Sequence, residues 1–546
     1  MYGGNGSSVE DIETPKRSHA DTSMWPCTSI SKDVARKSAA AALSGLMLFA
    51  AFPPLEYSFL AWIALIPLFW AITESAPGEA FACGFIAGAS FWLPSIFWLT
   101  RVTFIGWFGI SLYCALYTAF FSMAAAWFFM LRSRRPGDAS GGLSVLLGFP
   151  ALWVALEYAR AHLMTGFPWN QLGISQHGNL ALIQCADLGG VYAVSFLVAM
   201  GNTAALMLLR ESRRLALRPM VPILCFILLL AAALVYGRHR IAVMGPNGSS
   251  VQIVSVQPNV PQQLKWSQDW AAEIYERLRH SSDEACRRRK PDLLVWPETA
   301  LPDFLQSSAQ SREVVEQVRS HGAPLLAGSM HFEEMPGKSN YYNSSFLFLP
   351  GRDAPLVYAK RHLVPFGEYV PLGNLFPFLR SIAGVYEDFV PGHEVVVFDL
   401  SGCGKFSALI CFEDIFPYLA RDCVRAGARL LVNQTNDAWF DPLRASRQHM
   451  THCVFRCVEN RVACLRSANT GLTCHIDRRG KVGASIPPVQ AKPEDPRVMF
   501  AEVAFAPDDM PLTFYTRRGD LIALACLAFS LSLFAGMLLH RARKVK

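Results

Sequence analysis

The sequence predicts an integral membrane protein, an α-helical bundle of about eight transmembrane helices, that also carries an extracytoplasmic α/β domain. Three observations predict this fold class. Hydrophobic residues make up 52% of the 546 positions, apolar windows of about 20 residues gather toward the two ends of the chain, and the middle alternates short apolar runs with polar, helix-like stretches. Only 17% of the residues are charged, against roughly 25% in soluble domains. The composition therefore excludes a disordered or an ordinary cytosolic protein.

Eight windows are apolar enough to be predicted as membrane spans. The first two are short, and Pro53 and Pro54 between them allow only a tight connection, because proline cannot continue a helix. Residues 1–36 are polar, so we expect a disordered tail without a cleavable signal peptide. The predicted spans lie at about 37–55, 57–74, 78–100, 104–131, 143–162, 188–209, 219–237 and 521–540.

The orientation of these spans follows from their basic residues, because Lys and Arg near span ends are held on the cytoplasmic side. Both tails and the fourth and sixth connections carry sixteen basic residues, whereas the short connections on the opposite side carry only Arg101 and Arg160. With nine acidic residues, the same segments account for the whole net charge of +7, so nucleic-acid binding has no support. The sixteen are Lys16, Arg17, Lys32, Arg36, Lys37, Arg132, Arg134, Arg135, Arg210, Arg213, Arg214, Arg218, Arg541, Arg543, Lys544 and Lys546.

This asymmetry predicts both termini in the cytoplasm and the long middle segment outside it. The expected units are a disordered tail (1–36), a membrane domain with seven spans (37–237), an extracytoplasmic domain (238–519), and a last span with a basic tail (520–546). Apolar β-type runs in the third unit predict strands at 251–256, 293–296, 324–327, 346–349, 394–398, 406–410, 429–432 and 463–466. Helices are predicted at 269–288, 311–319 and 444–461.

Three reactive residues follow predicted strands or lie in connecting loops, where the chemistry of open α/β sheets usually gathers. Glu298 follows strand 293–296, Cys411 follows strand 406–410, and Lys360 lies in a loop. A thiol needs a base to become a thiolate, and a tetrahedral oxyanion needs a fixed positive charge. Taken singly, each also has a structural interpretation: a carboxylate beside a proline, a surface lysine and a buried core cysteine.

The strings around these residues are Val-Trp-Pro-Glu-Thr (295–299), Tyr-Ala-Lys-Arg-His-Leu-Val-Pro-Phe-Gly-Glu (358–368) and Leu-Ile-Cys-Phe-Glu (409–413). In this order they resemble the nitrilase, or carbon-nitrogen hydrolase, superfamily, whose members use a Glu-Lys-Cys triad on an α-β-β-α sandwich. Eight spans with this domain between the last two are similar to the apolipoprotein N-acyltransferases of the bacterial inner membrane. Further strings that carry the narrower resemblance are Thr165-Gly166-Phe167-Pro168-Trp169, Leu264-Lys265-Trp266, Tyr342-Asn343-Ser344, His362-Leu363-Val364-Pro365-Phe366-Gly367-Glu368-Tyr369-Val370-Pro371, Asn436-Asp437-Ala438-Trp439-Phe440 and Ala468-Asn469-Thr470-Gly471.

The resemblance implies a periplasmic catalytic domain and an acyl transfer in two half-reactions, the last step of lipoprotein maturation. Cys411 would attack an ester of a membrane phospholipid, typically phosphatidylethanolamine, and form a thioester. The α-amine of the diacylglyceryl-cysteine of an apolipoprotein would then take the acyl chain. Glu298 would act as the general base and Lys360 would stabilise the oxyanion. The resemblance implies no cofactor and no metal.

The resemblance also implies supporting residues. Glu368 would orient Lys360, and Glu413 matches a supporting position linked with substrate handling. The family pattern has a tyrosine directly after the nucleophile, but this chain has Phe412, so we assign no hydrogen-bonding role there. The substrate-binding residues that the resemblance implies are Trp266, Asn343 and Trp439.

Two other classes of function remain open. A membrane-tethered amidase of the same superfamily would resolve the thioester with water instead of an amine. A non-enzymatic lipid-binding protein would be indicated by loss of a triad residue, but all three are present. The charge state of Cys411 is also open, because an apolar environment raises the pKa of a thiol whereas an adjacent lysine lowers it.

Eight of the fourteen cysteines lie in the predicted extracytoplasmic domain, where disulfides are permitted. We expect Cys411 to be unpaired, because a nucleophile must be free. His449, Cys453 and Cys457 share one helix face, but without a fourth ligand we interpret them as core residues rather than a metal site. Near the end of the fifth span, we interpret three ionisable residues as side chains that reach the membrane interface. These three are Glu157, Arg160 and His162.

Overall fold

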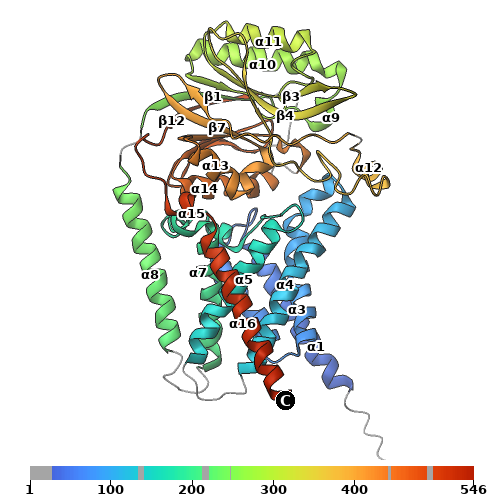
Figure 1. Ribbon diagram of the computed structural model, residues 1–546, viewed down its shortest axis with the longest axis vertical. Helices are drawn as coiled ribbons and strands as arrows, with labels where there is room; N and C mark the ends of the chain where they lie inside the picture. The colour runs from blue at the N-terminus through green and yellow to red at the C-terminus, as the bar shows by residue number, and fades with distance from the viewer. Residues whose placement is uncertain are drawn as a thin grey trace, which may run out of the picture.

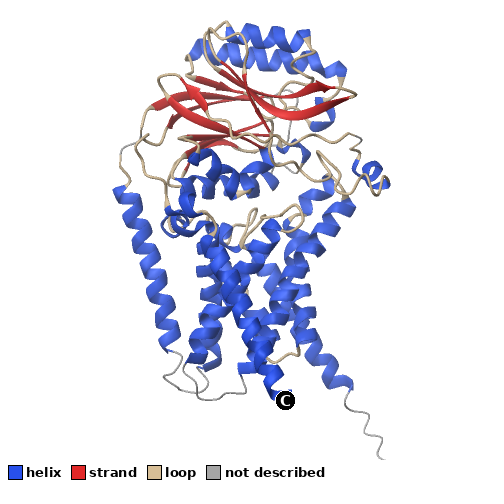
Figure 2. Ribbon diagram, viewed as in Figure 1, coloured by secondary structure: helices blue, strands red, loops and turns tan. Residues whose placement is uncertain are grey.

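The computed structural model describes residues 27–132, 140–211, 220–245, 248–385, 387–440, 444–488 and 496–545. Figure 1 shows a bundle of long helices with a layered α/β domain stacked on one end of it, and Figure 2 shows that the strands are confined to that domain. Most of the tail that we predicted to be disordered lies outside the described residues. Its last part, 27–36, is helical, because α1 begins at Cys27 rather than near residue 37.

Each of the eight predicted spans contains a helix, and four helices among the described residues are long and apolar enough to cross a membrane. These four lie at Phe104–Met130, Gly142–His162, Ala186–Arg210 and Met220–Val243, while Ser58–Ile72 and Leu521–Gly536 are shorter apolar segments. The helices of this part are α1 (Cys27–Ala50), α2 (Ile66–Ile72), α3 (Pro77–Ser95), α4 (Phe104–Arg132), α5 (Ser140–His162), α6 (Leu180–Ile183), α7 (Ala186–Glu211), α8 (Met220–Val243) and α16 (Leu521–Val545), with short 3-10 turns η1 (Ser58–Trp62), η2 (Phe97–Arg101) and η3 (Leu172–Gln176).

The α/β domain contains two six-stranded sheets. The strand order is β12-β1-β2-β3-β4-β5 in the first sheet and β11-β10-β9-β8-β7-β6 in the second. Strands β2 and β7, which precede Glu298 and Cys411, pair in parallel with β1 and β8. The strands are β1 (Ser250–Gln257), β2 (Leu293–Val295), β3 (Leu325–Met335), β4 (Lys338–Phe348), β5 (Leu356–Ala359), β6 (Phe398–Leu400), β7 (Gly404–Ile410), β8 (Leu430–Thr435), β9 (Ala463–Ala468), β10 (Thr473–Ile476), β11 (Val482–Ile486) and β12 (Arg497–Ala504).

Helices cover the outer face of each sheet, which gives the α-β-β-α order of layers (Figure 1). Helices α10 and α11 cover the first sheet, and their apolar sides form one core with it. The two sheets enclose a second core between them. Helices α13 and α14 lie between the second sheet and the helix bundle, and a third core continues from them into the bundle. The helices of the domain are α9 (Gln262–Lys265), α10 (Gln268–Arg288), α11 (Ala309–Arg319), α12 (Phe378–Ala383), α13 (Pro417–Arg425), α14 (Ala445–Asn460) and α15 (Phe514–Arg518).

Seven of the eight predicted strands and all three predicted helices of this domain are present, with shifted ends. The predicted strand at 394–398 is wrong except for Phe398, which begins β6. Val395 and Val397 pack partly buried against the core that continues into the bundle, so their apolar side chains are buried without a β-ladder. The sequence analysis missed β5, β10, β11 and β12, which are short or have polar, exposed positions.

One side chain of α14 joins the domain to the helix bundle through four hydrogen bonds. The Gln448 Oε1 accepts from the indole N–H groups of Trp98 (3.1 Å) and Trp169 (2.9 Å). Its Nε2 donates to the carbonyls of Pro53 (2.8 Å) and Ser95 (3.0 Å). All of these bonds are buried, and a buried amide that satisfies its donors and acceptors fixes the geometry around it. The domain is therefore docked on the helices in a defined position.

The interpretation of Glu157 and Arg160 as interface-seeking side chains is wrong, because both are buried. Arg160 donates to the carbonyls of Phe167 (2.6 Å) and Trp169 (2.8 Å). Glu157 accepts from the backbone N–H of Leu172 at 2.7 Å. These side chains supply hydrogen bonds to an irregular loop beneath the α/β domain, whose backbone groups would otherwise be unsatisfied. His162, by contrast, is exposed at the end of α5, as expected.

Candidate active site

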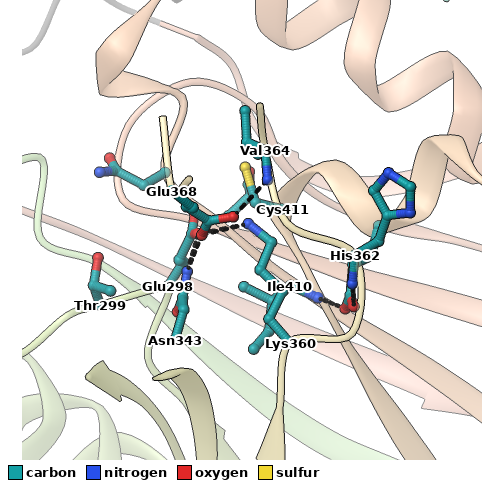
Figure 3. A network of polar contacts seen from close by, with 12 residues as sticks. Glu298, Thr299, Asn343, Lys360, His362, Val364, Glu368, Ile410 and Cys411 are labelled. Atoms are coloured by element: carbon teal, nitrogen blue, oxygen red, sulfur yellow. Dashed lines mark hydrogen bonds and ion pairs between the residues drawn. The ribbon is translucent and has the colours of Figure 1, made fainter. Parts of the chain in front are cut away.

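Glu298 lies in the turn after β2, and its carboxylate lies beside Asn343 and Lys360 (Figure 3). It is 7% exposed. Its Oε1 accepts a hydrogen bond from Asn343 Nδ2 at 2.8 Å and lies 3.7 Å from Lys360 Nζ. The carboxylate therefore has one short hydrogen bond and one long ion pair, which leaves acceptor positions free for a proton.

Lys360 follows β5, and its ammonium lies between two carboxylates (Figure 3). Nζ donates to Glu368 Oε1 at 2.9 Å, in addition to the longer contact with Glu298. Burial lowers the pKa of Lys360, but the charges of Glu368 and Glu298 outweigh burial and raise this pKa above its ordinary value. Lys360 is therefore a fixed positive charge at neutral pH.

Glu368 is held by three donors, more than Glu298. Its Oε1 accepts from Lys360 and from Asn343 Nδ2 at 2.9 Å, and its Oε2 accepts from the backbone N–H of Val364 at 2.8 Å. The Asn343 amide thus bridges both glutamates, which we did not foresee when we took this residue as substrate-binding. Its side-chain nitrogen donates to both carboxylates and holds them relative to each other, and its role in substrate binding stays a prediction.

Cys411 starts the 3-10 turn η4 (Cys411–Ile415) at the end of β7. Its φ is +51°, the left-handed region that L-residues rarely adopt, and such backbone strain persists only where neighbours over-determine it. Asn433 Nδ2 donates to the Cys411 carbonyl at 3.1 Å. The Glu413 carboxylate accepts from the backbone N–H of Ile410 at 2.7 Å, on the other side of the bend. Together these bonds fix the backbone at Cys411, whose thiol lies close enough to Glu298 and Lys360 to sense their charges.

The surroundings of the Cys411 thiol determine its charge state, which the sequence left open. Burial raises the pKa of Cys411, the charge of Glu298 raises it further, and the Lys360 ammonium offsets only part of these effects. Burial therefore wins, and the pKa of the thiol lies above its ordinary value. The resting form is the neutral thiol, so reaction requires a neighbouring base to take its proton.

Glu413 is fully buried, so it lies in the scaffold of the site and not on a surface open to substrate. Its carboxylate accepts from the Tyr358 hydroxyl (2.8 Å) and from the backbone N–H groups of Arg361 (2.7 Å) and His362 (3.2 Å). With the bond from Ile410, it ties the segment after Lys360 to the turn that carries the nucleophile. Its supporting role in the reaction stays a prediction.

The two predicted tryptophans stand apart from this buried network. Trp266 and Trp439 are 44% and 48% exposed. Trp266 follows α9, whereas Trp439 ends the 3-10 turn η5 (Asp437–Trp439) after β8. No hydrogen bond joins either residue to Cys411 among the described residues. Their exposed rings leave the role in substrate binding as a prediction.

The loop with the string 165–169 lies against the nucleophile turn. The Trp169 ring stacks with the ring of Phe412 at a centroid distance of 6.4 Å and an interplanar angle of 15°. Phe412 also meets the Phe416 ring edge-on at 5.4 Å. Phe412 therefore connects the helix bundle to the nucleophile turn by aromatic packing, which needs no hydroxyl group.

Behind the nucleophile turn lies a second group of buried charges that the sequence analysis missed. His449 Nε2 is 2.7 Å from Asp414, and its Nδ1 is 3.2 Å from Asp437. Cys453 donates to Asp414 at 2.8 Å, so two of the three residues on this helix face bond to a carboxylate. The thirteen cysteines whose side chains the structure describes, Cys411 included, form no disulfide. Within the described ranges no three or more His, Cys, Asp or Glu side chains are grouped as metal ligands would be.

The fold and the site together define a membrane-associated protein with a carbon-nitrogen hydrolase domain. A family model described as carbon-nitrogen hydrolase matches residues 249–505, and one described as apolipoprotein N-acyltransferase N-terminal domain matches residues 44–204. The apolipoprotein N-acyltransferase of Geobacter metallireducens is 38% identical over 501 residues, which cover 89% of this chain and 92% of the relative. That of Chlorobaculum tepidum is 29% identical over 520 residues, covering 89% and 94%. The chain belongs to the apolipoprotein N-acyltransferase family.

Among solved structures, Nit3 of Saccharomyces cerevisiae, a member of branch 10 of the nitrilase superfamily, aligns with 47% of this chain and 91% of its own length. The sequence identity is 18% and the TM-score is 0.35. The family assignment rests on the family models and the full-length relatives above.

Proposed function

We propose that this protein transfers an acyl chain from a membrane phospholipid, through a thioester on Cys411, to the α-amine of the diacylglyceryl-cysteine of apolipoproteins. The observation that carries the proposal is a buried thiol beside a carboxylate with free acceptor positions and a fixed ammonium, in a domain docked on membrane-type helices. The first half-reaction releases a lysophospholipid and the second releases the N-acylated lipoprotein. We take phosphatidylethanolamine as the donor, and the chemistry uses no cofactor.

In the first half-reaction, Glu298 takes the thiol proton while the Cys411 sulfur forms a bond to the ester carbonyl carbon. The carbonyl oxygen becomes an oxyanion, which the Lys360 ammonium and nearby backbone N–H groups stabilise. Collapse of this intermediate breaks the bond to the glycerol oxygen, which takes the proton from Glu298 and leaves as the lysophospholipid hydroxyl. The chain then remains on the enzyme as a thioester.

In the second half-reaction, the lipoprotein amine attacks the thioester carbonyl and gives a proton to Glu298. The same ammonium stabilises the second oxyanion. When the carbon–sulfur bond breaks, the sulfur takes the proton back, and an amide is formed. Because Glu298 and Cys411 end in their starting states, one site serves both steps.

The membrane topology is a further part of the proposal. We propose eight spans, with residues 37–237 and 520–546 in the bacterial inner membrane or its cytoplasmic edge and residues 238–519 in the periplasm. The sixteen basic residues on one side against two on the other support this orientation. We expect a single cysteine introduced at Lys338, an exposed position of the domain, to be labelled from the periplasm. A single cysteine at residue 545 should be labelled only after the membrane is opened. Labelling of both from the same side would refute the topology.

The transfer itself is tested with the purified protein, phosphatidylethanolamine vesicles and a synthetic diacylated lipopeptide. Mass spectrometry should find the lipopeptide heavier by one acyl chain, and an equal amount of lysophospholipid. A lipopeptide with an acetylated amine is the matched control and should stay unchanged. Fatty acid release without any change in the lipopeptide would instead indicate the hydrolytic, amidase-type alternative.

A further inference from the structure

A second lysine is buried next to the candidate active site. Lys265, the last residue of α9, is 2% exposed, and its Nζ donates to the carbonyl of Glu298 (3.1 Å) and to the hydroxyl of Thr299 (2.6 Å). Lysine is almost never fully buried unless it is paired, yet Lys265 is in no ion pair among the residues that the structure describes. Its two bonds are to neutral acceptors in the turn that carries Glu298.

This turn is strained and is held from two sides. Thr299 has φ +41°, which is an outlier for a β-branched residue. On one side, the backbone N–H of Ala300 donates to the carbonyl of Gly328 on β3 at 2.8 Å, and a Cβ atom at Gly328 would lie 2.3 Å from the Pro297 carbonyl. On the other side, the Lys265 ammonium donates to the Glu298 carbonyl and to the Thr299 hydroxyl. The position of the Glu298 carboxylate therefore depends on Lys265.

The charges of the site give Lys265 a second effect. Glu298 and Glu368 share the single ammonium of Lys360, so these three groups carry a net negative charge. The Lys265 ammonium balances it. Burial lowers the pKa of Lys265 to about 8, although Glu298 and Cys411, the charged and titratable groups facing it, both act to raise this pKa. Lys265 is thus positively charged at pH 7 and loses its charge as the pH rises through about 8.

We propose that Lys265 is a positioning residue for the first half-reaction: its ammonium fixes the turn that holds Glu298 and balances the charge of the site while the thiol of Cys411 loses its proton. This inference rests on the proposed role of Glu298. The Lys265 ammonium also lies 5.8 Å from the centre of the exposed ring of Trp266.

The test measures the single-turnover rate of acyl-enzyme formation on phosphatidylethanolamine vesicles at several pH values between about 6 and about 9.5. Intact-protein mass detects the acyl-enzyme. Lys265→Met keeps the length of the side chain without its charge, and we expect it to be about 10- to 100-fold slower at pH 7. The wild-type rate should fall above about pH 8, where Lys265 is deprotonated. The Met variant should lack this fall, whereas Lys265→Arg should keep more activity and move the fall to higher pH.

Two further variants keep the inference testable. Lys338→Met, at an exposed position of the β3–β4 hairpin, is the matched control and should equal the wild type. Thr299→Val removes one acceptor of Lys265 but leaves the buried charge, so we expect a smaller loss with the pH dependence retained, even if Lys265→Met fails to fold. A Met variant within twofold of the wild type at all pH values would overturn the role of Lys265 alone. Absence of any adduct on the wild type would instead overturn the proposed function.

Discussion

Two clusters of charged side chains share the turn η4 and differ in how completely their charges are paired. We call Glu298, Asn343, Lys360, Glu368 and Cys411 the reactive cluster, and Asp414, Asp437, His449 and Arg466 the scaffold cluster. Cys411 and Asp414 are three residues apart, yet each belongs to a different cluster. The comparison shows which buried charges are available for chemistry.

In the scaffold cluster, every carboxylate has several short donors. Asp414 accepts from His449 (2.7 Å) and from Arg466 (3.2 Å), and Asp437 accepts from Arg466 at 2.8 Å. The two carboxylates are therefore paired with two cations, His449 and Arg466. In the reactive cluster, one ammonium is shared, and Glu298 receives it only at 3.7 Å. A carboxylate whose acceptor positions are filled by donors is a poor general base. Glu298 has free acceptor positions and a thiol nearby.

The largest effect is expected from the nucleophile. Cys411→Ala should abolish the acyl-enzyme adduct. Cys411→Ser should be severely impaired, because a hydroxyl has a much higher pKa than a thiol and Glu298 deprotonates it less readily. Intact-protein mass after incubation with phospholipid measures this. An adduct that persisted on Cys411→Ala would place the nucleophile elsewhere.

The next effect separates the two glutamates of the reactive cluster. Glu298→Gln keeps the shape but cannot accept a proton, so we expect the acylation rate to fall by about 10²- to 10⁴-fold. Glu368→Gln keeps one oxygen that can accept from Lys360, although its NH2 group cannot accept from the Val364 N–H, and we expect a smaller loss of about tenfold to a hundredfold. Single-turnover acylation compares them directly. Equal rates, or a faster Glu298→Gln, would make Glu368 the better candidate for the base.

In the scaffold cluster, we expect substitution to affect stability more than chemistry. Burial and Arg466 lower the pKa of His449, but the two aspartates outweigh them and raise it above its ordinary value. The imidazolium therefore stabilises the fold below a pH of about 6.5, and this contribution is lost as the pH rises through the raised pKa. His449→Gln should cost about 3 kcal/mol at pH 6, with a smaller difference at pH 9.

Thermal unfolding of the wild type and of His449→Gln across this pH range measures that difference. A difference that does not change with pH would mean that the His449 ring is neutral and acts only by packing. The residual acylation rate of the folded variant provides the second readout, and it should stay within about tenfold of the wild type, since His449 contacts Asp414 and Asp437 and not Cys411 itself.

The smallest effect is expected at an exposed ion pair, which is the baseline for both clusters. Arg288 lies 2.5 Å from Glu284 on α10, and both side chains are largely exposed. Exposed pairs contribute about 0–1 kcal/mol, so Arg288→Ala should leave the melting temperature and the acylation rate nearly unchanged. A loss as large as that of His449→Gln would show that pairing in a buried environment is not what distinguishes the scaffold cluster.

Much of the fold could be predicted because apolar runs at strand length mark buried strands. The runs before Glu298 and Cys411 became β2 and β7, which placed both residues at strand ends. The run at 394–398 was misleading, because apolar side chains can be buried by packing on a helix layer as well as in a sheet. Strands such as β11, whose residues are mostly exposed, have no apolar pattern to recognise.

The site was only partly predictable for a different reason. The triad strings are local, but the partners that set their geometry are distant in the sequence. Asn343 lies 45 residues from Glu298, and His449 lies 35 residues from Asp414. Lys265 lies in the Leu264-Lys265-Trp266 string, yet only the structure shows that it is buried and bonded to the turn after β2. Pairing of this kind depends on tertiary structure, which residue patterns alone do not contain.

The most direct test of the central claim, that Cys411 carries the acyl chain between two substrates, is a hand-over experiment. The wild-type protein is first incubated with phosphatidylethanolamine alone, separated from free lipid, and then mixed with a diacylated lipopeptide. We expect the protein to gain the mass of one acyl chain in the first step and to lose it in the second, with an equal amount of chain appearing on the lipopeptide amine. Loss of the chain from the protein to water, at a rate that the lipopeptide does not change, would contradict the account.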